Sequence, residues 1–371
     1  MSEAMVVNLF FTVRVFLVAG LLLLLPRIIR KGLLFGVYVG EEVALGSAAE
    51  QLQRFWRRGC LCLALLSLAI GLSISWAGRP VTGNLTGTVI LLCSALAFYL
   101  YVYSRARKLI LPPATGQASK AVASLEVRGP RETGFAKLSL GLCVFTSLAV
   151  LAYAVHGLLA MPDQVPAVTE TRTMVDKSII TFLFMPCLNL VIAPFYALFA
   201  LLIAGAKRAL RDGMDSRSVE AQEAFRAINV RALSWIALLM CAFSSLISVQ
   251  IVRIGLAELD VLWPSVLWPA LGVLAVMVAF LIRIIRRHGQ GGSFREYGSE
   301  ESRLTGGLAD NEHWVGGLLY FDRDDPSLMI EKRFGLGYGF NYGNRLAVLI
   351  VATFVVLIAG FIGLAIFNFG S

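Results

Sequence analysis

Two polar side chains interrupt stretches of the sequence that are otherwise apolar. Arg14 lies midway in the first such stretch, and Asn189 lies between Pro186 and Pro194 in the fifth. A charge inside a membrane span usually faces a partner or water. A helix broken by proline beside an amide can form a substrate site. Both residues are therefore candidate ligand-binding residues.

Each of the two has an alternative interpretation. The arginine can snorkel towards the outer surface, and the prolines can kink a helix for packing while Asn189 bonds to a neighbouring helix. No Asp or Glu lies deep inside any apolar stretch. The expected partner of Arg14 is therefore a near-surface acid or a backbone carbonyl. Proton-coupled transport, which relies on buried carboxylates, is disfavoured for the same reason.

A second group of candidates surrounds a short polar segment between two apolar stretches. It contains His156, Asp163, Asp176 and Lys177. Histidine changes its charge near neutral pH, so His156 can pair with either aspartate. The alternative is a histidine that lies at the membrane interface. The two carboxylates can accept hydrogen bonds from a basic ligand or from Lys177.

The region before the last apolar stretch predicts a small β-hairpin. Residues 317–321 and 328–332 have the composition of strands, and the acidic segment 322–326 ends in proline, as a turn does. Residues 334–343 then alternate glycines with aromatic residues. Six residues in this region are candidate cytoplasmic signalling residues: Trp314, Asp324, Asp325, Lys332, Arg333 and Asn341.

Motifs for catalysis, metal binding and cofactor binding are absent from the sequence. It contains no G-x-S-x-G, H-E-x-x-H, Walker or kinase element. The aspartates at 322, 324 and 325 do not have EF-hand spacing, and the glycines at 335, 337 and 339 do not open a βαβ unit. All 6 cysteines fall in apolar stretches, where they favour packing. We expect neither enzymatic activity, nor a cofactor, nor a metal.

The elements that must position these residues are membrane helices. Hydrophobic residues make up 57% of the 371 residues and charged residues only 15%, which excludes a water-soluble enzyme. A bilayer is spanned by about 20 apolar residues in a helix. The sequence therefore predicts an all-α polytopic membrane protein with eight transmembrane helices: Val6–Leu25, Cys60–Ala77, Leu85–Tyr103, Leu138–Ala160, Ser178–Ala204, Ala232–Val252, Trp263–Ile282 and Leu346–Phe367.

Basic residues predict the orientation of these helices. All but five of the 33 lysines and arginines lie in four alternate loops, 26–59, 104–137, 205–231 and 283–345. Because basic loops face the cytoplasm, both termini are expected outside, in a multi-pass inner (plasma) membrane protein. The net charge of +9 then reflects topology and contact with lipid head groups. It does not indicate binding to nucleic acid.

The predicted organisation has six parts. A three-helix region, 1–137, includes the glycine-flanked segment Phe35–Val39. A helix pair with an outer loop, 138–206, is followed by two further helices, 207–282. A linker, 283–309, leads to a small cytoplasmic domain, 310–345, and to the last helix, 346–371. The small domain is too short for a core of its own, so we expect residues 314–342 to contact Phe35 or Tyr38.

The C-terminal segment resembles a bacterial domain of unknown function that often ends membrane proteins of the SdpI-like group. The residues that carry the resemblance are His313-Trp314, Gly316-Gly317, Leu319–Phe321, Asp324–Pro326, Glu331–Gly335 and Gly337–Asn341. They follow the pattern W-x-x-G-x-x-Y-x-x-x-D-D-P and then K-R-x-G-x-G-x-T-x-N, with Gly339 in place of the threonine.

Residues 142–206 resemble a helix pair of the same group. The outer loop begins with the P-D-x-x-P sequence Pro162–Pro166, and Asp176–Ser178 open the next helix. The His, Asn and Gly that usually follow are missing from residues 167–172. Phe35–Val39 more weakly resembles a further element of the group. The resemblance implies immunity to a secreted peptide and signalling to a cytoplasmic regulator.

Three functions remain open. The first is a non-enzymatic membrane protein that senses or neutralises a secreted peptide or an amphiphile. The second is a small-molecule transporter or permease that uses the helix around Asn189 together with Arg14. The third is a scaffold subunit of a larger membrane complex. Besides the lipid bilayer, the expected partners are the peptide or amphiphile and a cytoplasmic regulator or complex partner.

Overall fold

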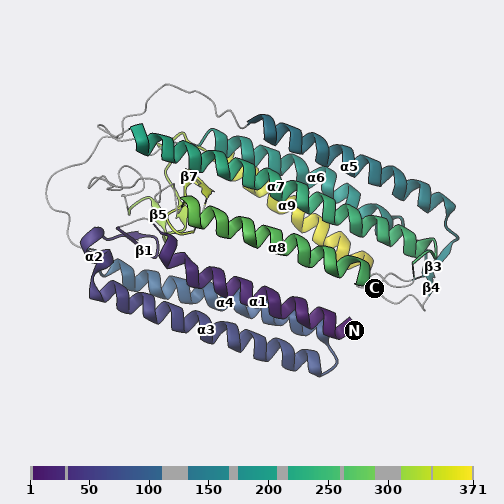
Figure 1. Cartoon of the computed structure of the whole chain (residues 1–371), viewed down its shortest axis with the longest axis horizontal. Coiled ribbons are helices and arrows are strands. Elements are labelled where there is room, and N and C mark those ends of the chain that lie inside the picture. The colour runs from purple at the N-terminus through teal and green to yellow at the C-terminus, as the bar shows by residue number, and fades with distance from the viewer. Residues whose placement is uncertain are drawn as a thin grey trace. The chain divides into compact units, whose positions relative to one another are not determined.

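The structure is a computed structural model, and it describes residues 3–29, 32–110, 133–166, 174–206, 216–259, 263–288, 311–335 and 337–369. Within these residues the chain is mainly helical (Figure 1). Eight long helices are present: α1 (Glu3–Ile28), α3 (Ser47–Trp76), α4 (Pro80–Arg107), α5 (Thr133–Ala160), α6 (Ile179–Ala204), α7 (Ser216–Gly255), α8 (Trp263–His288) and α9 (Arg345–Phe369). The short helix α2 spans Glu41–Leu45.

Each predicted transmembrane span corresponds to one of the eight long helices. Seven of them contain a stretch that is long and apolar enough to cross a membrane, and α8 contains a shorter apolar stretch, Trp268–Ile284. The chain is therefore an all-α polytopic membrane protein. Helix α3 begins well before the predicted span Cys60–Ala77, at Ser47, and runs through it as one 30-residue helix. Most of the basic loop 104–137 and most of the predicted linker 283–309 lie outside the described residues.

The chain folds into two compact units. The first comprises Met1–Val127, Lys207–Gln222 and Ile285–Asn344. The second comprises Arg128–Ala206, Glu223–Ile284 and Arg345–Ser371. The small domain before the last helix therefore belongs to the same unit as α1, α3 and α4.

The helices of the first unit approach each other closely because small residues line their contact. The Ser67 hydroxyl of α3 donates a hydrogen bond of 2.6 Å to the Gly87 carbonyl of α4. A methyl group added at Gly71 would collide with the Phe11 ring of α1 and with the Gly83 carbonyl of α4. Contacts of this kind are common between membrane helices, where packing replaces the hydrophobic effect.

The first unit also contains three two-stranded antiparallel sheets. In the first, β1 (Leu33–Leu34) pairs with β2 (Val37–Tyr38) directly after α1. The others are formed by β5 (Trp314–Val315) with β6 (Leu319–Tyr320) and by β7 (Met329–Glu331) with β8 (Tyr338–Phe340). The predicted hairpin is therefore two smaller ones, joined by a bridge between Tyr320 and Asn341. We call residues 311–344 the β module.

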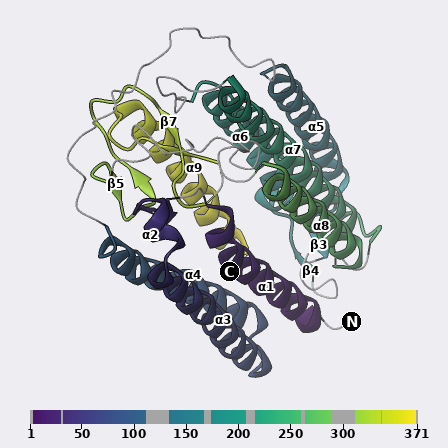
Figure 2. The ribbon, with the colours of Figure 1, turned by 60° about the vertical axis from the view of Figure 1, so that its left-hand side comes forward.

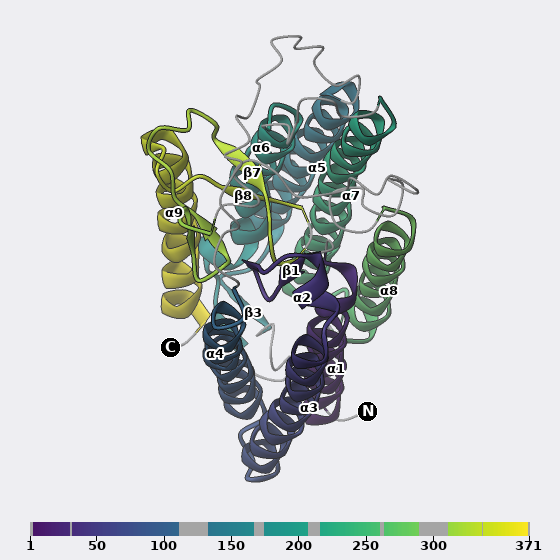
Figure 3. The same ribbon diagram turned by 90° about the vertical axis from the view of Figure 1, so that its left-hand side faces the viewer.

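The second unit is built around the antiparallel pair α5 and α6. A small sheet of β3 (Gln164–Pro166) and β4 (Met174–Asp176) connects these two helices. Helix α7 lies beside them (Figures 2 and 3). Aromatic rings join α6 to α9, with Phe195 and Phe354 at 5.1 Å between ring centroids. Helix α6 stays continuous through both Pro186 and Pro194, so the broken helix that the prolines predicted is not formed.

The close contact at Gly71 yields a first prediction. Substitution of Gly71 by alanine should destabilise the first unit by about 1–3 kcal/mol, because the added methyl group overpacks the contact of α1, α3 and α4. Gly20→Ala is the matched control, since nothing lies within 4 Å of a methyl group at that position. Thermal unfolding of the detergent-solubilised variants measures the difference. Equal melting temperatures for the two variants would contradict it.

Candidate functional site

The candidate site begins with a tight turn at the end of α1. Gly36 has a φ of 79°, which a side chain rarely adopts, and it follows Phe35 in the turn between β1 and β2. A methyl group at Gly36 would collide with the Gly317 backbone and with the Tyr99 hydroxyl oxygen. Glycine therefore allows the backbones of this turn and of the β module to touch.

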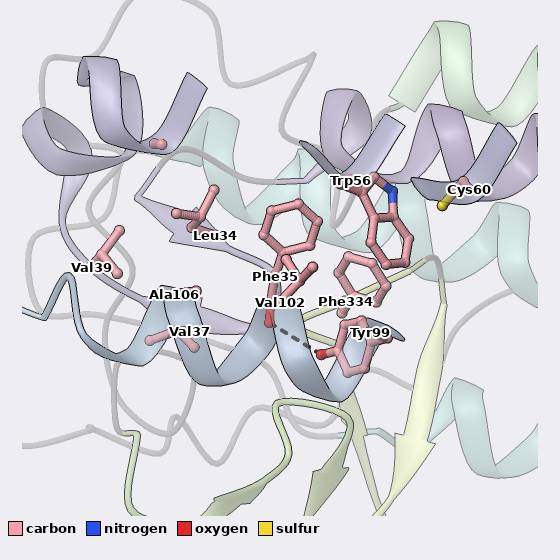
Figure 4. Close-up of a cluster of buried hydrophobic side chains, with 11 residues drawn as sticks. Leu34, Phe35, Val37, Val39, Trp56, Cys60, Tyr99, Val102, Ala106 and Phe334 are labelled. Carbon is pink, nitrogen blue, oxygen red and sulfur yellow. Dashed lines mark hydrogen bonds between the residues drawn. The ribbon is translucent and has the colours of Figure 1, made fainter. Parts of the chain in front are cut away.

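Four aromatic rings from different parts of the chain surround this contact (Figure 4). Phe334 of the β module lies 4.7 Å from Tyr99 of α4, 6.1 Å from Phe35 and 6.3 Å from Trp56 of α3, measured between ring centroids. Trp56 is fully buried, and its indole N–H donates to the Leu22 carbonyl of α1 at 2.9 Å. We call these four residues the aromatic cluster. It joins the β module to all three helices of the unit.

Hydrogen bonds fix the same contact. The Tyr99 hydroxyl lies 3.1 Å from the Phe35 carbonyl and 3.0 Å from the Gly316 carbonyl. The side chain of Asn311 accepts from the Tyr38 N–H and donates to the Tyr38 carbonyl, each at 3.0 Å. Asn311 thus bonds to β2 as a neighbouring strand would. The predicted contact of residues 314–342 with Phe35 or Tyr38 is confirmed.

This contact constrains the number of membrane crossings. The turn at residues 32–40 and the β module touch, so they lie on the same side of the membrane. An even number of spans must therefore separate them. Helices α3, α4, α5, α6 and α7 give five crossings, and α8 must supply the sixth. The docking therefore supports eight spans, although the apolar part of α8 is the shortest.

Inside the β module, Arg333 connects the docking residues to a buried ring. Its guanidinium carbon lies 5.0 Å from the centroid of the Trp314 ring. Its Nη1 atom donates to Asn311 Oδ1 at 2.8 Å. Arg333 is only 1% exposed and Trp314 4%. The arginine therefore orients the asparagine that bonds to Tyr38.

Asn341 organises the acidic turn of the module. Its amide nitrogen donates to the carbonyls of Asp322 and Asp325, each at 2.9 Å. Its oxygen accepts from the N–H groups of Asp322 and Gly343 at 3.0 and 2.9 Å. The side chain is completely buried, so all of its hydrogen-bonding capacity serves the turn.

Tyr320 completes the network around this turn. Its hydroxyl lies 3.1 Å from carboxylate oxygens of both Asp325 and Asp322. Burial raises the pKa of Tyr320, and the charges of Asp325 and Asp322 raise that pKa further. The hydroxyl therefore stays protonated and donates to the carboxylates. Burial also lowers the pKa of Lys332, which is half-buried.

The six predicted signalling residues thus lie together in one module, but most of them face its interior. Trp314, Asp325, Arg333 and Asn341 are buried, and only Asp324 is exposed. The Asp322 and Asp325 carboxylates accept from backbone N–H groups of their own turn. Among the described residues no group of three or more side chains could hold a metal ion. The buried residues of the motif therefore hold the module together and are not themselves a surface that a partner can contact.

The predicted ligand residues of the outer loop form a surface hairpin. Lys177 Nζ lies 3.7 Å from the Asp163 carboxylate and donates to the Met161 carbonyl at 3.1 Å. Asp176 accepts from the Gln164 side chain at 3.4 Å. His156 is exposed on α5, and in the described part of the chain no bond joins it to either aspartate. The possible pairing of His156 with an aspartate is therefore not formed there, and its exposure agrees with the alternative of an interfacial histidine.

Arg14 and Asn189 lie in different units. Arg14 of α1 donates to the Thr88 hydroxyl of α4, which is neither the acid nor the backbone carbonyl that we expected. Asn189 Oδ1 accepts from the Ser244 hydroxyl of α7 at 2.8 Å. Helix packing thus brings a neutral hydroxyl next to Arg14 and another next to Asn189. Because these hydroxyls belong to other helices, the spacing of residues along the sequence does not reveal them.

The residues that dock the module carry almost no signal in the sequence. Tyr99 resembles the aromatic residues that normally lie at a membrane interface, so nothing marked its hydroxyl as a link between segments. Asn311 precedes the strand-like segment and belongs to no motif. Only Gly36 and Gly317 are recognisable from the sequence. Each glycine lies in a segment rich in aromatic residues, where the lack of a side chain allows another backbone to approach closely.

Together these features define a class of protein: a polytopic helical membrane protein with a β module docked on the ends of its helices. A family of unknown function (DUF5808) matches residues 323–348, from the acidic turn of the module to the start of α9. The predicted domain of unknown function is thereby confirmed at this position. No curated protein and no solved structure matches the chain.

The Tyr320 network yields a second prediction. Tyr320→Phe should lower the free energy of unfolding of the module by about 1.5–3 kcal/mol, because the one hydroxyl proton that the two carboxylates share is lost. Tyr342→Phe is the control and should change little. Hydrogen exchange of backbone amides in residues 313–331 measures both effects.

The second prediction includes a dependence on pH. Because folding raises the pKa of Tyr320 above its ordinary value of 10.0, the stability it contributes is complete below pH 10 and falls above it. Each further pH unit should cost about 1.4 kcal/mol. The Tyr320→Phe variant should show a slope smaller by this amount, and an unchanged slope would contradict the assignment.

Proposed function

We propose that the chain is a non-enzymatic bacterial inner-membrane protein of the SdpI-like type. In this proposal it senses or neutralises a secreted peptide or a small amphiphile that acts on the cell envelope. The β module passes the state of the membrane helices to a cytoplasmic regulator. The observation that carries the proposal is the aromatic cluster, in which Phe334 of the module packs against Tyr99 and Trp56.

The aromatic cluster supports a relay for a mechanical reason. Tyr99 and Trp56 belong to two packed helices, and their rings lie 6.3 Å apart between centroids. A ligand that shifts α3 or α4 changes the surface on which Phe334 rests. Because the Tyr99 hydroxyl also contacts Gly316, such a shift changes a packing contact and a hydrogen bond together. The module then has two arrangements that a partner can distinguish.

The outer hairpin is the proposed contact for a basic peptide. Asp163 is fully exposed, and its ion pair with Lys177 is long and accessible to solvent. Exposed pairs of this kind contribute only about 0–1 kcal/mol, so a peptide amine can replace Lys177 at little cost. The missing His, Asn and Gly of this loop do not take part in this contact.

The two other functions have weaker support. A transporter needs a gap in a helix or a charged path, and α6 is continuous through both of its prolines. A scaffold subunit needs a stoichiometric partner. Flux of a labelled solute into proteoliposomes would support the former, and copurification of one partner would support the latter.

The third prediction concerns orientation. We propose that both termini lie outside and that the basic loops, with the β module, lie in the cytoplasm. A reporter fused after Ser371 should behave as external, and one inserted near Gly291 as cytoplasmic. The reverse pattern would contradict the orientation, and external signals from both would contradict the count of eight spans.

The fourth prediction tests the relay. Deletion of the gene should sensitise the cells to at least one secreted peptide or envelope stress, and the wild-type chain should restore resistance. Tyr99→Phe should restore it several-fold less at equal membrane levels, because the bonds to the turn and to the module are lost. Tyr103→Phe, whose ring stacks on Tyr99 at 6.4 Å, is the matched control. Equal rescue by both variants would exclude the relay.

A further inference from the structure

Arg14 is a charged residue exposed on the surface of the first unit within a helix that crosses the membrane. It lies in the span Asn8–Ile28 of α1, and its side chain is exposed. The guanidinium lies 5.7 Å from the centroid of the buried Phe11 ring and donates to the Thr88 hydroxyl. These two contacts hold it against the seam between α1 and α4.

Thr88 takes part in two hydrogen bonds at once, as an acceptor from Arg14 and as a donor to its own helix. The Thr88 hydroxyl donates to the Asn84 carbonyl at 2.6 Å, so its lone pairs are free to accept from Arg14. An arginine has five N–H donors and no acceptor. Among the described residues Thr88 is the only hydrogen-bond partner of this side chain. Because the side chain is exposed and its other N–H groups have no partner among the described residues, they are available to an anion, which matches their charge.

The depth of Arg14 identifies the kind of anion. Thr88 lies eight residues after the start of α4, which corresponds to about 12 Å of helix. This distance places the guanidinium below the surface of the bilayer but within reach of head groups through its long side chain. A soluble anion would have to enter the apolar region to reach it, whereas an amphiphile offsets part of that cost by burying its apolar chain.

Apolar side chains continue from Arg14 towards the centre of the membrane. Helices α1 and α4 run in parallel, because Arg14 pairs with Thr88 near one end and the turn after α1 meets Tyr99 near the other. Leu21 follows Arg14 by two turns of α1, and Leu92 follows Thr88 by one turn of α4. Both leucines are exposed, at 42% and 56%. They offer an apolar surface for an acyl or alkyl chain.

We propose that Arg14 and Thr88 bind the carboxylate or phosphate head group of an anionic amphiphile, whose chain lies along Leu21 and Leu92. The inference rests on the proposed function and names the class of ligand that acts on the first unit. Binding at this place would act directly on α4, the helix that carries Tyr99 at its other end.

Photolabelling of the full-length protein in neutral phosphatidylcholine nanodiscs tests the proposal. The probe is a long-chain alkyl phosphate that carries a diazirine in its chain, and the corresponding alkyl alcohol is the neutral control. We expect the phosphate to label peptides that contain Leu21 or Leu92 at least about tenfold more than the alcohol does. Equal labelling by the two probes would overturn the proposal.

Variants show whether the anionic probe binds at Arg14 and Thr88 or is attracted to any positive charge on the protein. Arg14→Gln should reduce the labelling about tenfold, Thr88→Val should reduce it by less, and Arg14→Lys should retain part of it. Arg79→Gln, at the exposed start of α4, is the matched control and should label as the wild type does. Unchanged melting temperatures show that the variants fold. Normal labelling of Arg14→Gln would overturn the assignment.

Two further readouts distinguish the remaining outcomes. Inorganic phosphate in excess should not displace the probe, and displacement would show a site for free anions instead of amphiphiles. Resistance of cells that carry Arg14→Gln is measured in parallel. Specific labelling without any sensitivity of the deletion strain would keep the binding site and reject the proposed function. Sensitivity without specific labelling would do the opposite.

Discussion

The packing of Phe334 between Tyr99 and Trp56 is the contact on which the β module depends. The strands of the module are two or three residues long, and hairpins of this size are not stable alone in water. A buried phenylalanine contributes about 1.5–3 kcal/mol, and it does so here only because helix ends provide the other rings. The stability of the module is therefore largely the stability of its docking. An extramembrane element built in this way responds to any change in the helices that hold it.

Because the module depends on its docking, the residues of the C-terminal motif serve mainly to shape the docked edge. Arg333 lies on Trp314 and bonds to Asn311, which pairs with the backbone of Tyr38. A charge that is 1% exposed is costly unless its bonds are made. The contacts of Arg333 with Trp314 and Asn311 thus hold the docked edge in one arrangement.

The fold was predictable from sequence to the extent that it follows from apolar length. All eight long helices correspond to predicted spans, because a lipid environment requires a helix of about 20 residues wherever the chain crosses it. Docking of the module was predictable from its aromatic residues, which could not remain exposed. The particular partners were not. Asn311 and Tyr99 act through single polar atoms, and those atoms find each other only after α4 and the turn at Gly36 are in place.

The polar residues within the membrane show why spacing alone could not assign partners there. Thr88 donates to its own helix and can still accept from Arg14, so the two bonds support each other. Ser244 lies 2.8 Å from Asn189 Oδ1 and 2.7 Å from the Met240 carbonyl. Its single proton serves one of these acceptors at a time, and the Asn189 amide nitrogen has no partner among the described residues.

The hydroxyl groups of Thr88 and Ser244 therefore have different roles. In the first unit an acceptor stabilises a donor that carries charge, which leaves an outward-facing cation able to attract an anion. In the second unit two acceptors compete for one donor between neutral groups, which suits a contact between helices. The difference lies in the direction of the hydrogen bonds, and it is the physical reason to place ligand recognition at Arg14 and helix packing at Asn189.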